Sequence, residues 1–440
     1  MALDIKPRTK TRVVQRQAAS RPETIKVDIC VVGAGSAGIS ASIEAAKLGR
    51  SVALVDSQPA LGGQAFNSII GTFCGLFSNG PNPYQVTHGI ADDILRDLGA
   101  QGALHYRRNP QHTTVVMYDE VALGRWVEEA VMKAGVKPIT GAVMRSVARD
   151  GRRIKELDLA TRYGDVKISA TGFVDASGDA ALTWLAGLPC REAEEGAIYG
   201  TQMVVLENID EANIPSREEL AEHQKKVIGK YGLVRQDGFA FAFPGRGTAL
   251  VNMTHVETPL EPVGATLKSI EGKAQADKVV HMLKSEYPKA FGNVRVRAYG
   301  ALGIRQTRWI VGRHQLAVDE VRNGTRFPDT IARTAWPIEL HEREGYVWEP
   351  FSADHMHYVP LGSLTPPDVD NLVAAGRCID GDAAALSSVR VMGPCIAMGA
   401  AAAHALDLAG SGSVHQIDKA ALEKRLYDNV TRADRPAASA

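Results

Sequence analysis

Residues 27–56 read VDICVVGAGSAGISASIEAAKLGRSVALVD, and this stretch decides the fold class. Two apolar runs, 27–32 and 52–55, predict buried strands. Between them lies a G-x-G-x-x-G turn that opens a helix of mostly small and apolar residues, 36–49. A strand, a glycine-rich turn, a helix and a second strand form the βαβ unit of a dinucleotide-binding fold.

Each glycine of the turn has a physical role. Gly33 permits the tight turn, Gly35 lets the backbone approach a pyrophosphate, and Gly38 allows the helix to pack closely on the strand. The helix start, which includes Ser36 and Ala37, offers free N–H groups and a positive dipole end to phosphates. The turn therefore predicts a dinucleotide site.

The second strand ends at Asp56, whose carboxylate can accept hydrogen bonds from a ribose 2′-OH. A 2′-phosphate would be repelled there. Shortly after it the chain reads Leu61-Gly62-Gly63-Gln64, with Gly62 six residues beyond Asp56. A glycine pair suits a backbone that must pass close beneath a cofactor without side-chain interference.

With these residues, the chain resembles the flavoproteins that carry two dinucleotide motifs. They include the glutathione-reductase-like fold and its succinate dehydrogenase/fumarate reductase relatives. In that family, an Ala-Ala-x-x-Gly helix end and a Gly-Gly after the ribose acid accompany FAD rather than NAD. The loop after Gly63 has no histidine of the kind that tethers FAD covalently in succinate dehydrogenases. The resemblance therefore implies non-covalent FAD.

Three further segments carry the same resemblance, which covers residues 26 to about 410. Residues 173–179 (FVDASGD) resemble the second flavin motif, with Ser177 in the place of its usual threonine. Residues 371–379 (NLVAAGRCI) with 388–394 (SVRVMGP), and residues 303–308 (GIRQTR), resemble one subgroup of FAD-dependent oxidoreductases. The FAD contacts implied in all are Gly33, Gly35, Ser36, Ala37, Gly38, Asp56, Ser57, Gly62, Gly63, Gln64, Val143, Ala176, Ser177, Gly178, Asp179, Gly376, Arg377 and Gly393.

A chain of 440 residues exceeds the usual size of one domain. We expect an α/β protein with a Rossmann-like FAD-binding domain around a central parallel sheet, and an inserted α+β substrate domain. The predicted order is a basic, disordered arm (1–25), the FAD-binding domain (26–190 and 365–412), the substrate or cap domain (191–364), and a C-terminal helix and tail (413–440).

Local patterns place the other elements. Helical spacing predicts helices over 119–134 and 264–287, and a closing helix from about 393. By analogy, the start of the closing helix would face the flavin and stabilise negative charge on it. Residues 64–90 are predicted to be a loop. The predicted strands are 141–148, 153–159, 165–169, 172–175, 200–206, 239–243, 248–256 and 294–299.

Composition limits the partners. Fifty lysines and arginines balance fifty aspartates and glutamates, so no overall field attracts nucleic acid or a membrane surface. The longest apolar run, 394–408, is too short to span a bilayer. Five scattered cysteines form no C-x-x-C motif, and no signal peptide is present, which favours a reducing, cytoplasmic location.

The basic arm has two interpretations. It is either a solvated tail, or a targeting or docking segment that contacts a partner subunit. The partners expected are a small-molecule substrate and, through the arm, a second copy or another subunit.

The substrate side offers five candidate catalytic residues. Arg305 and Arg308 lie three apart on a predicted turn or helix start, so both can face one way and bind an anion. Arg390 precedes the closing helix. For each arginine, the alternative is a salt bridge. His341 and Tyr358 stand where the subgroup keeps a histidine and a tyrosine, which implies proton handling.

Other polar residues leave alternatives open. His355 and His357 would share one side of an extended segment, but no partner spacing supports a metal site. Subgroup members commonly carry a histidine between the Ala-Gly-Arg-Cys and Arg-Val-Met elements, and this chain has none. Either the acid–base role lies elsewhere, or Asp380 or Asp382 serves.

The function expected is that of an FAD-dependent dehydrogenase, oxidase or reductase. It would transfer hydride between non-covalent FAD and a small polar, carboxylate-bearing substrate. The alternatives are a flavin monooxygenase that uses NAD(P)H and oxygen, and a flavin-carrying subunit of a larger complex.

Overall fold

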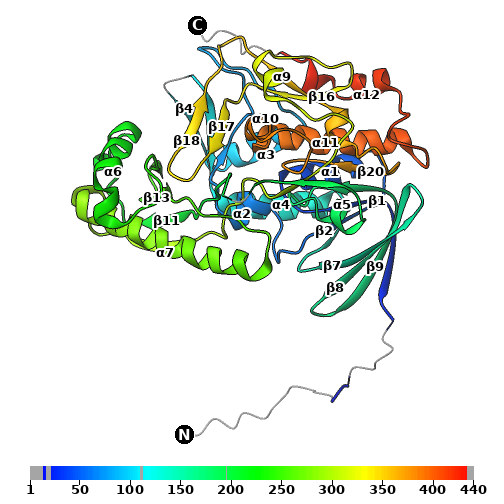
Figure 1. Cartoon of the computed structure of the whole chain (residues 1–440), viewed down its shortest axis with the longest axis horizontal. Helices are drawn as coiled ribbons and strands as arrows, with labels where there is room; N and C mark the ends of the chain where they lie inside the picture. The colour runs from blue at the N-terminus through cyan, green and yellow to red at the C-terminus, as the bar shows by residue number, and fades with distance from the viewer. Residues whose placement is uncertain (1–12, 16–20, 110–111, 195, 434–440) are drawn as a thin grey trace.

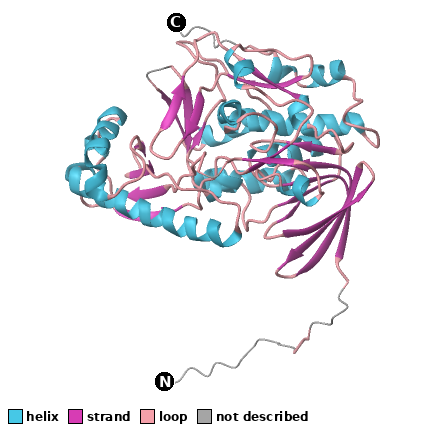
Figure 2. Cartoon of the chain, in the orientation of Figure 1, coloured by secondary structure: helices cyan, strands magenta, loops and turns pink. Residues whose placement is uncertain are grey.

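The computed structural model describes residues 13–15, 21–109, 112–194 and 196–433. Within these residues the main sheet has seven strands in the order β6-β2-β1-β9-β8-β7, with β20 joined to β9 (Figures 1 and 2). Its strands are β1 (Glu23–Val32), β2 (Val52–Val55), β6 (Lys137–Ile139), β7 (Val143–Asp150), β8 (Arg153–Thr161), β9 (Gly164–Asp175) and β20 (Leu372–Ala374). The pairings of β6, β2, β1, β9 and β20 are parallel, and β7 and β8 add an antiparallel hairpin. The predicted α/β fold is confirmed.

Two strands are longer than predicted. β1 begins at Glu23, not at Val27, because its first residues pair with β9, as Glu23 does with Val166. Residues 23–25 are therefore strand rather than arm, and 1–12 and 16–20 lie outside the described residues. The two strands predicted at 165–169 and 172–175 are one strand, β9. Its first half pairs with β8 and its second half with β20, so no break is needed.

Small residues let two helices cover the sheet near the dinucleotide turn. They are α1 (Ser36–Lys47) and α11 (Met392–Ala409), which lie next to each other and beside β20 in Figure 1. A Cβ added at Gly399 of α11 would lie 2.0 Å from the carbonyl oxygen of Ala37. The predicted helix at 119–134 is confirmed as α4 (Glu120–Lys133), whose N-cap Asp119 accepts a hydrogen bond from the Ala122 N–H.

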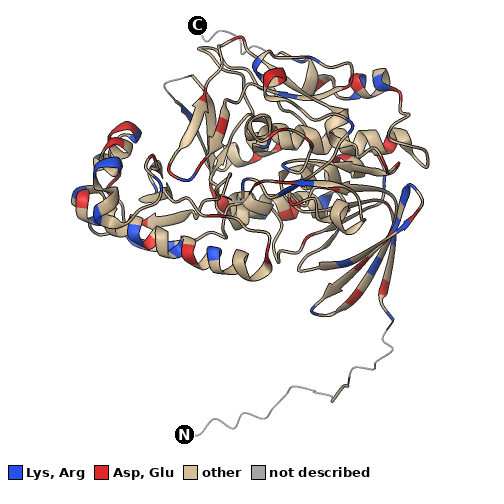
Figure 3. Cartoon of the chain, in the orientation of Figure 1, with Lys and Arg blue, Asp and Glu red and all other residues tan. Residues whose placement is uncertain are grey.

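A second, antiparallel sheet lies beside the first. In the described part of the chain it has four strands, β12 (Phe239–Phe243), β13 (Thr248–Asn252), β11 (Val204–Glu207) and β14 (Arg295–Tyr299), in that order. The predicted long helix is α7 (Pro262–Glu286), which packs on this sheet with α6 (Arg217–Tyr231). Lysine, arginine and acidic residues alternate along the outer side of both helices (Figure 3).

The segment after the second sheet returns to the main core. Trp309, Ile331, Val359 and Leu364 belong to the same buried cluster as α1 and α11. The domain boundaries predicted at 190 and 364 stay predictions. The remaining elements are α2 (Gly63–Asn67), β3 (Thr72–Phe73), α3 (Ile90–Ala100), β4 (Leu104–Arg108), β5 (Thr114–Tyr118), α5 (Ala181–Leu185), β10 (Cys190–Glu192), α8 (Pro288–Phe291), β15 (Arg308–Ile310), α9 (Val318–Arg322), β16 (Thr330–Thr334), β17 (Ile338–His341), β18 (Tyr346–Glu349), β19 (His357–Pro360), α10 (Ala383–Val389), α12 (Lys419–Arg425) and α13 (Tyr427–Val430).

The predicted loop at 64–90 is partly wrong, because α2 and β3 interrupt it. Among the described residues, α11 is the one helix long and apolar enough to cross a membrane, and 72% of it is buried inside the protein. That burial is typical of a core helix. The predicted cytoplasmic location stays a prediction.

Candidate active site

A cavity of about 900 Å³ extends from the start of α1 to the second sheet and the β17–β18 hairpin. The first βαβ unit, the end of β9 and the segment after β20 form one end of it. The predicted FAD contacts that line this end are Gly33, Gly35, Ser36, Ala37, Asp56, Ser57, Gly63, Gln64, Ala176, Ser177, Gly178, Asp179, Gly376 and Arg377.

The start of α1 is open toward the cavity. Its N-cap is Gly35, no side chain caps it, and its first turn holds no acidic residue. A Cβ added at Gly35 would meet nothing within 4 Å, so open space lies against the backbone there. Free N–H groups beside open space fit a pyrophosphate.

Asp56 is held in place on the cavity wall. Its carboxylate accepts hydrogen bonds from the N–H groups of Ala34, at 2.6 Å, and Gln58, at 2.7 Å. Burial raises the pKa of Asp56, and these two bonds oppose that rise. Each carboxylate oxygen keeps a further lone pair that can accept from a ribose hydroxyl. The residues present therefore fit FAD.

The segment predicted to carry the second flavin motif, 173–179, meets the subgroup segments 371–379 and 303–308 at this end. Arg377 forms an ion pair with Asp179 at 2.8 Å, and Thr307 donates a hydrogen bond to the same carboxylate. The contact joins the end of β9, the segment after β20 and the loop before β15. Sequence reasoning placed these segments at the cofactor, and the structure brings them together.

Four predicted contacts lie outside the cavity lining. Gly38 serves helix packing, because its added Cβ would lie 1.7 Å from the carbonyl oxygen of Gly33. Gly393 likewise packs against Gly75, and Gly62 occupies a left-handed turn with φ +107°. Val143 is the first residue of β7 and is 59% exposed, and its predicted contact stays a prediction.

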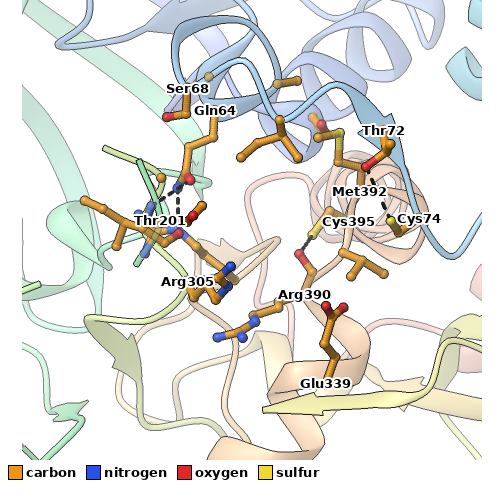
Figure 4. A pocket seen from close by; sticks show the side chains of 18 of the residues that line it. Gln64, Ser68, Thr72, Cys74, Thr201, Arg305, Glu339, Arg390, Met392 and Cys395 are labelled. Carbon is orange, nitrogen blue, oxygen red and sulfur yellow. Dashed lines mark hydrogen bonds between the residues drawn. The ribbon is translucent and has the colours of Figure 1, made fainter. Parts of the chain in front are cut away.

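Two predicted arginines converge at the other end of the cavity (Figure 4). Arg305 lies in the loop before β15, and Arg390 is the C-cap of α10. Arg305 donates a hydrogen bond to the carbonyl of Tyr199 at 2.6 Å, and Nη1 of Arg390 has no partner. Neither guanidinium forms an ion pair with a carboxylate of the described residues.

The charges of these two arginines are therefore poorly compensated. Burial lowers the pKa of Arg390 to about 10, against the opposing effect of Glu339. Burial also lowers the pKa of Arg305, and the nearby charges of Arg235 and Arg390 add to that effect. An anion bound between Arg305 and Arg390 would relieve this repulsion.

The predicted histidine lies on the same wall. His341 ends β17, and its Nε2 lies 3.2 Å from Oε1 of Glu339. Its ring stacks on Tyr346, with ring centres 5.4 Å apart. Burial, followed by the charges of Arg305 and Arg235, lowers the pKa of His341 well below its ordinary value. The imidazole is therefore neutral and can accept a proton.

Sequence reasoning missed Glu339 and the aromatic residues around it. Trp336, Tyr346 and Trp348 line the cavity, and the two indole rings meet edge to face at 5.7 Å. Phe239 also lines the cavity, and the guanidinium of Arg217 lies over its ring at 4.5 Å and over that of Tyr346 at 5.7 Å. A signal existed for Glu339, because residues two apart in a strand, such as 339 and 341, share a face.

Two predicted catalytic residues lie away from the cavity. Arg308 pairs with Glu192 at 2.7 Å and lies over the ring of Trp184 at 4.1 Å. Residues 305–308 form a loop that enters a strand, not a helical turn, so the spacing of three sends the two arginines apart. Tyr358, on β19, lies 5.6 Å from the guanidinium of Arg326. Neither residue lines the cavity, so the structure does not bring them together with Arg305, Arg390 and His341.

The other open alternatives also resolve into structural roles. Asp380 is fully buried, and it pairs with Arg191 at 2.9 Å and accepts the Gly312 N–H. Asp382 caps α10. His357 contacts His355 at 3.1 Å and Ser388 at 2.8 Å. No cluster of three or more metal-binding side chains occurs in the described residues.

Comparisons with known proteins agree with the cofactor end of this cavity. A family model described as FAD dependent oxidoreductase matches residues 28–426. No curated protein matches the chain.

Several solved structures are similar to the chain at low identity. They include a geranylgeranyl bacteriochlorophyll reductase-like protein from Thermoplasma acidophilum (13% identity, TM-score 0.49, 92% of this chain and 84% of that one). A flavin-dependent brominase (14%, 0.46, 92% and 83%) and an aromatic hydroxylase from angucycline biosynthesis (12%, 0.46, 92% and 68%) also match. The family match covers most of the chain, which therefore belongs to the FAD dependent oxidoreductase family and is a flavoenzyme whose cofactor is FAD.

Proposed function

We propose that this enzyme transfers hydride between a small carboxylate-bearing substrate and non-covalently bound FAD. The observation that carries the proposal is the pair Arg305 and Arg390, two guanidinium groups in one cavity without a carboxylate partner among the described residues. Within this proposal the enzyme belongs to the succinate dehydrogenase/fumarate reductase-like subgroup, on the strength of the sequence motifs.

The residues of the cavity divide the work. When bound, FAD supplies the hydride acceptor or donor. Arg305 and Arg390 would hold the substrate carboxylate, for which a planar guanidinium fork is well suited. His341, neutral and beside Glu339, would exchange the proton that accompanies hydride transfer. Trp336 and Trp348 would shield the site from water, so the substrate is expected to carry an apolar part beside its carboxylate.

The test is an anaerobic titration of the FAD-bound enzyme with pairs of carboxylic acids and their primary amides, followed by flavin absorbance. Each acid is also tried as an oxidant of the photoreduced enzyme, since the direction is open. The expected result is that one or more acids change the flavin redox state and that the matching amides do not. A flavin that responds only to NAD(P)H, or equally to acids and amides, would refute the proposal.

Two further expectations belong with the proposal. We expect a cytoplasmic enzyme. We expect no nucleic-acid partner, because the numbers of basic and acidic residues are equal. We also expect a second copy or another subunit to contact the basic N-terminal arm, most of which lies outside the described residues.

A further inference from the structure

A chain of hydrogen bonds leads from the cavity wall into the protein. It runs from Oε1 of Glu339 to Nε2 of His341 at 3.2 Å, and from Nδ1 of His341 to Nε2 of His255 at 3.2 Å. It ends where Nδ1 of His255 meets the carbonyl oxygen of Arg343 at 3.1 Å. His255 is 1% exposed and His341 is 3% exposed, so Glu339 is the end of this chain that opens onto the cavity.

The carbonyl at the far end determines where the protons lie. A carbonyl oxygen only accepts, so Nδ1 of His255 must carry its proton. A neutral His255 then has a lone pair on Nε2, which can only accept from the N–H at Nδ1 of His341. A neutral His341 consequently turns a lone pair at Nε2 toward Glu339.

The last junction has room for one more proton. A neutral His341 with its lone pair at Nε2 makes no hydrogen bond to an ionised Glu339, because both atoms are acceptors. One added proton completes the bond, either on the carboxyl group or on Nε2. With all its hydrogen bonds formed, the chain therefore carries one proton more than it does when both histidines are neutral and Glu339 is ionised.

Charged groups on several elements face this junction. Arg305, Arg235, Arg390 and Arg217 all act on His341, and each disfavours a second positive charge there. Burial and the charges of Arg235 and Arg305 lower the pKa of His255 in the same way, so the added proton does not settle on the inner histidine. Asp237, which pairs with Arg235 at 2.8 Å, offsets part of this positive field.

We propose that Glu339 and His341 together hold one exchangeable proton at the cavity wall, and that His255 is a positioning residue that keeps His341 in the Nδ1–H tautomer. The proton's catalytic use rests on the proposed function. In that reaction, an O–H or N–H bond of the substrate breaks, and its proton bonds to Nε2 of His341 or to Glu339. Bound FAD would supply the two-electron acceptor for the hydrogen of the adjacent C–H bond, and the substrate would gain a C=O or C=N bond.

The test is ¹⁵N NMR of the full-length, FAD-bound enzyme with labelled histidine, because nitrogen shifts distinguish a ring N–H from a bare ring nitrogen. The His341 signals are assigned by their loss in His341→Gln. At neutral pH, His341 is expected to be neutral with its proton on Nδ1. A proton on Nε2 with a bare Nδ1 would overturn the proposal.

Matched variants separate positioning from mere structure. His255→Gln keeps a carbonyl acceptor near the position of Nε2, and it should preserve the Nδ1–H tautomer of His341. His255→Leu removes the acceptor and should move the proton to Nε2, while bound flavin absorbance confirms folding. A His341 tautomer that is the same in both variants and in the wild type would rule out positioning by His255.

A pH titration tests the shared proton. The Nε2 signal of His341 should pass through a single transition in the wild type. It should not do so in Glu339→Gln, whose amide N–H donates to Nε2 at every pH. An unchanged transition in Glu339→Gln would refute the shared proton. Failure of the flavin to respond to carboxylic acids would remove the proposed substrate but would leave these signals as predicted.

Discussion

Two glycines of one turn should respond to the same substitution in opposite ways. In Gly38→Ala, the new methyl would lie 1.7 Å from the carbonyl oxygen of Gly33, which is backbone and cannot rotate away. Overpacking of this kind costs about 1–3 kcal/mol, and a clash with backbone belongs at the upper end, so about 3 kcal/mol of folding stability should be lost.

In Gly35→Ala, the methyl meets no protein atom within 4 Å. The free energy of unfolding of the apoprotein should change by no more than about 1 kcal/mol. Alanine is a poorer N-cap than glycine, but it also lowers the conformational entropy of the unfolded chain, which offsets this loss. The methyl would instead enter the space where the pyrophosphate should pass. A steric penalty of about 1–3 kcal/mol then weakens FAD binding by about 5- to 150-fold.

Two assays check the pair. Thermal unfolding of the apoproteins measures stability, and quenching of FAD fluorescence on binding measures affinity. The reasoning would be refuted if Gly35→Ala bound FAD as tightly as the wild type, or if Gly38→Ala were as stable as the wild type. Equal loss of stability in both variants would also refute it, because the two glycines would then share a packing role.

Three further predictions concern substrate binding, stability and pH. Arg390→Met should weaken binding of the carboxylate substrate by about 2–5 kcal/mol, at least about 30-fold, while FAD stays bound. The control variant Arg308→Met should bind the substrate like the wild type, because Arg308 pairs with Glu192 outside the cavity. Flavin absorbance titrations measure the affinity of both variants. Arg191→Met removes the ion-pair partner of the fully buried Asp380 carboxylate and should lower the free energy of unfolding by about 2 kcal/mol. The loss is smaller than for a fully buried pair, because Arg191 is 37% exposed. An unchanged midpoint of urea unfolding would contradict this prediction. Burial alone would raise the pKa of Asp407, but hydrogen bonds from Arg425 and Arg50 outweigh burial and lower the pKa below 3.8. The ionised carboxylate therefore stabilises the fold above pH 3.8. This contribution is lost as the pH falls through the folded-state pKa. Asp407→Asn should therefore be less stable than the wild type at neutral pH, with a gap that narrows below about pH 4; a gap that is constant with pH would contradict the assignment.

The cofactor end could be predicted because its signals are local. Gly33, Gly35 and Asp56 act within one βαβ unit, where spacing along the chain fixes spacing in space. The second flavin motif (173–179) and the subgroup segment 371–379 were placed by resemblance, and the pair Asp179–Arg377 joins them. Val143 lies outside the cavity lining, because a place in that lining depends on which way one side chain of a strand faces.

The substrate end could be predicted only in part, because its walls come from distant segments. Arg305 and Arg308 look equivalent in the sequence, and only the extended backbone between them separates their directions. Tyr358 directly follows the buried His357 in the same strand, so its side chain points to the other face, where it lies by Arg326 and away from the cavity. The contact of His255 with His341 joins residues that no local pattern relates.

The order in which the cavity walls occur along the chain has a consequence for biosynthesis. Gly35 is among the first cofactor-binding residues made, whereas Arg377 and Cys395, which line the same cavity, are made near the end. Cys395 belongs to the helix α11, which packs against α1, and most of that helix is made after it. A nascent polypeptide that stops at residue 370 is therefore expected to leave translation without flavin, and capture of the coenzyme should follow completion of almost the whole chain.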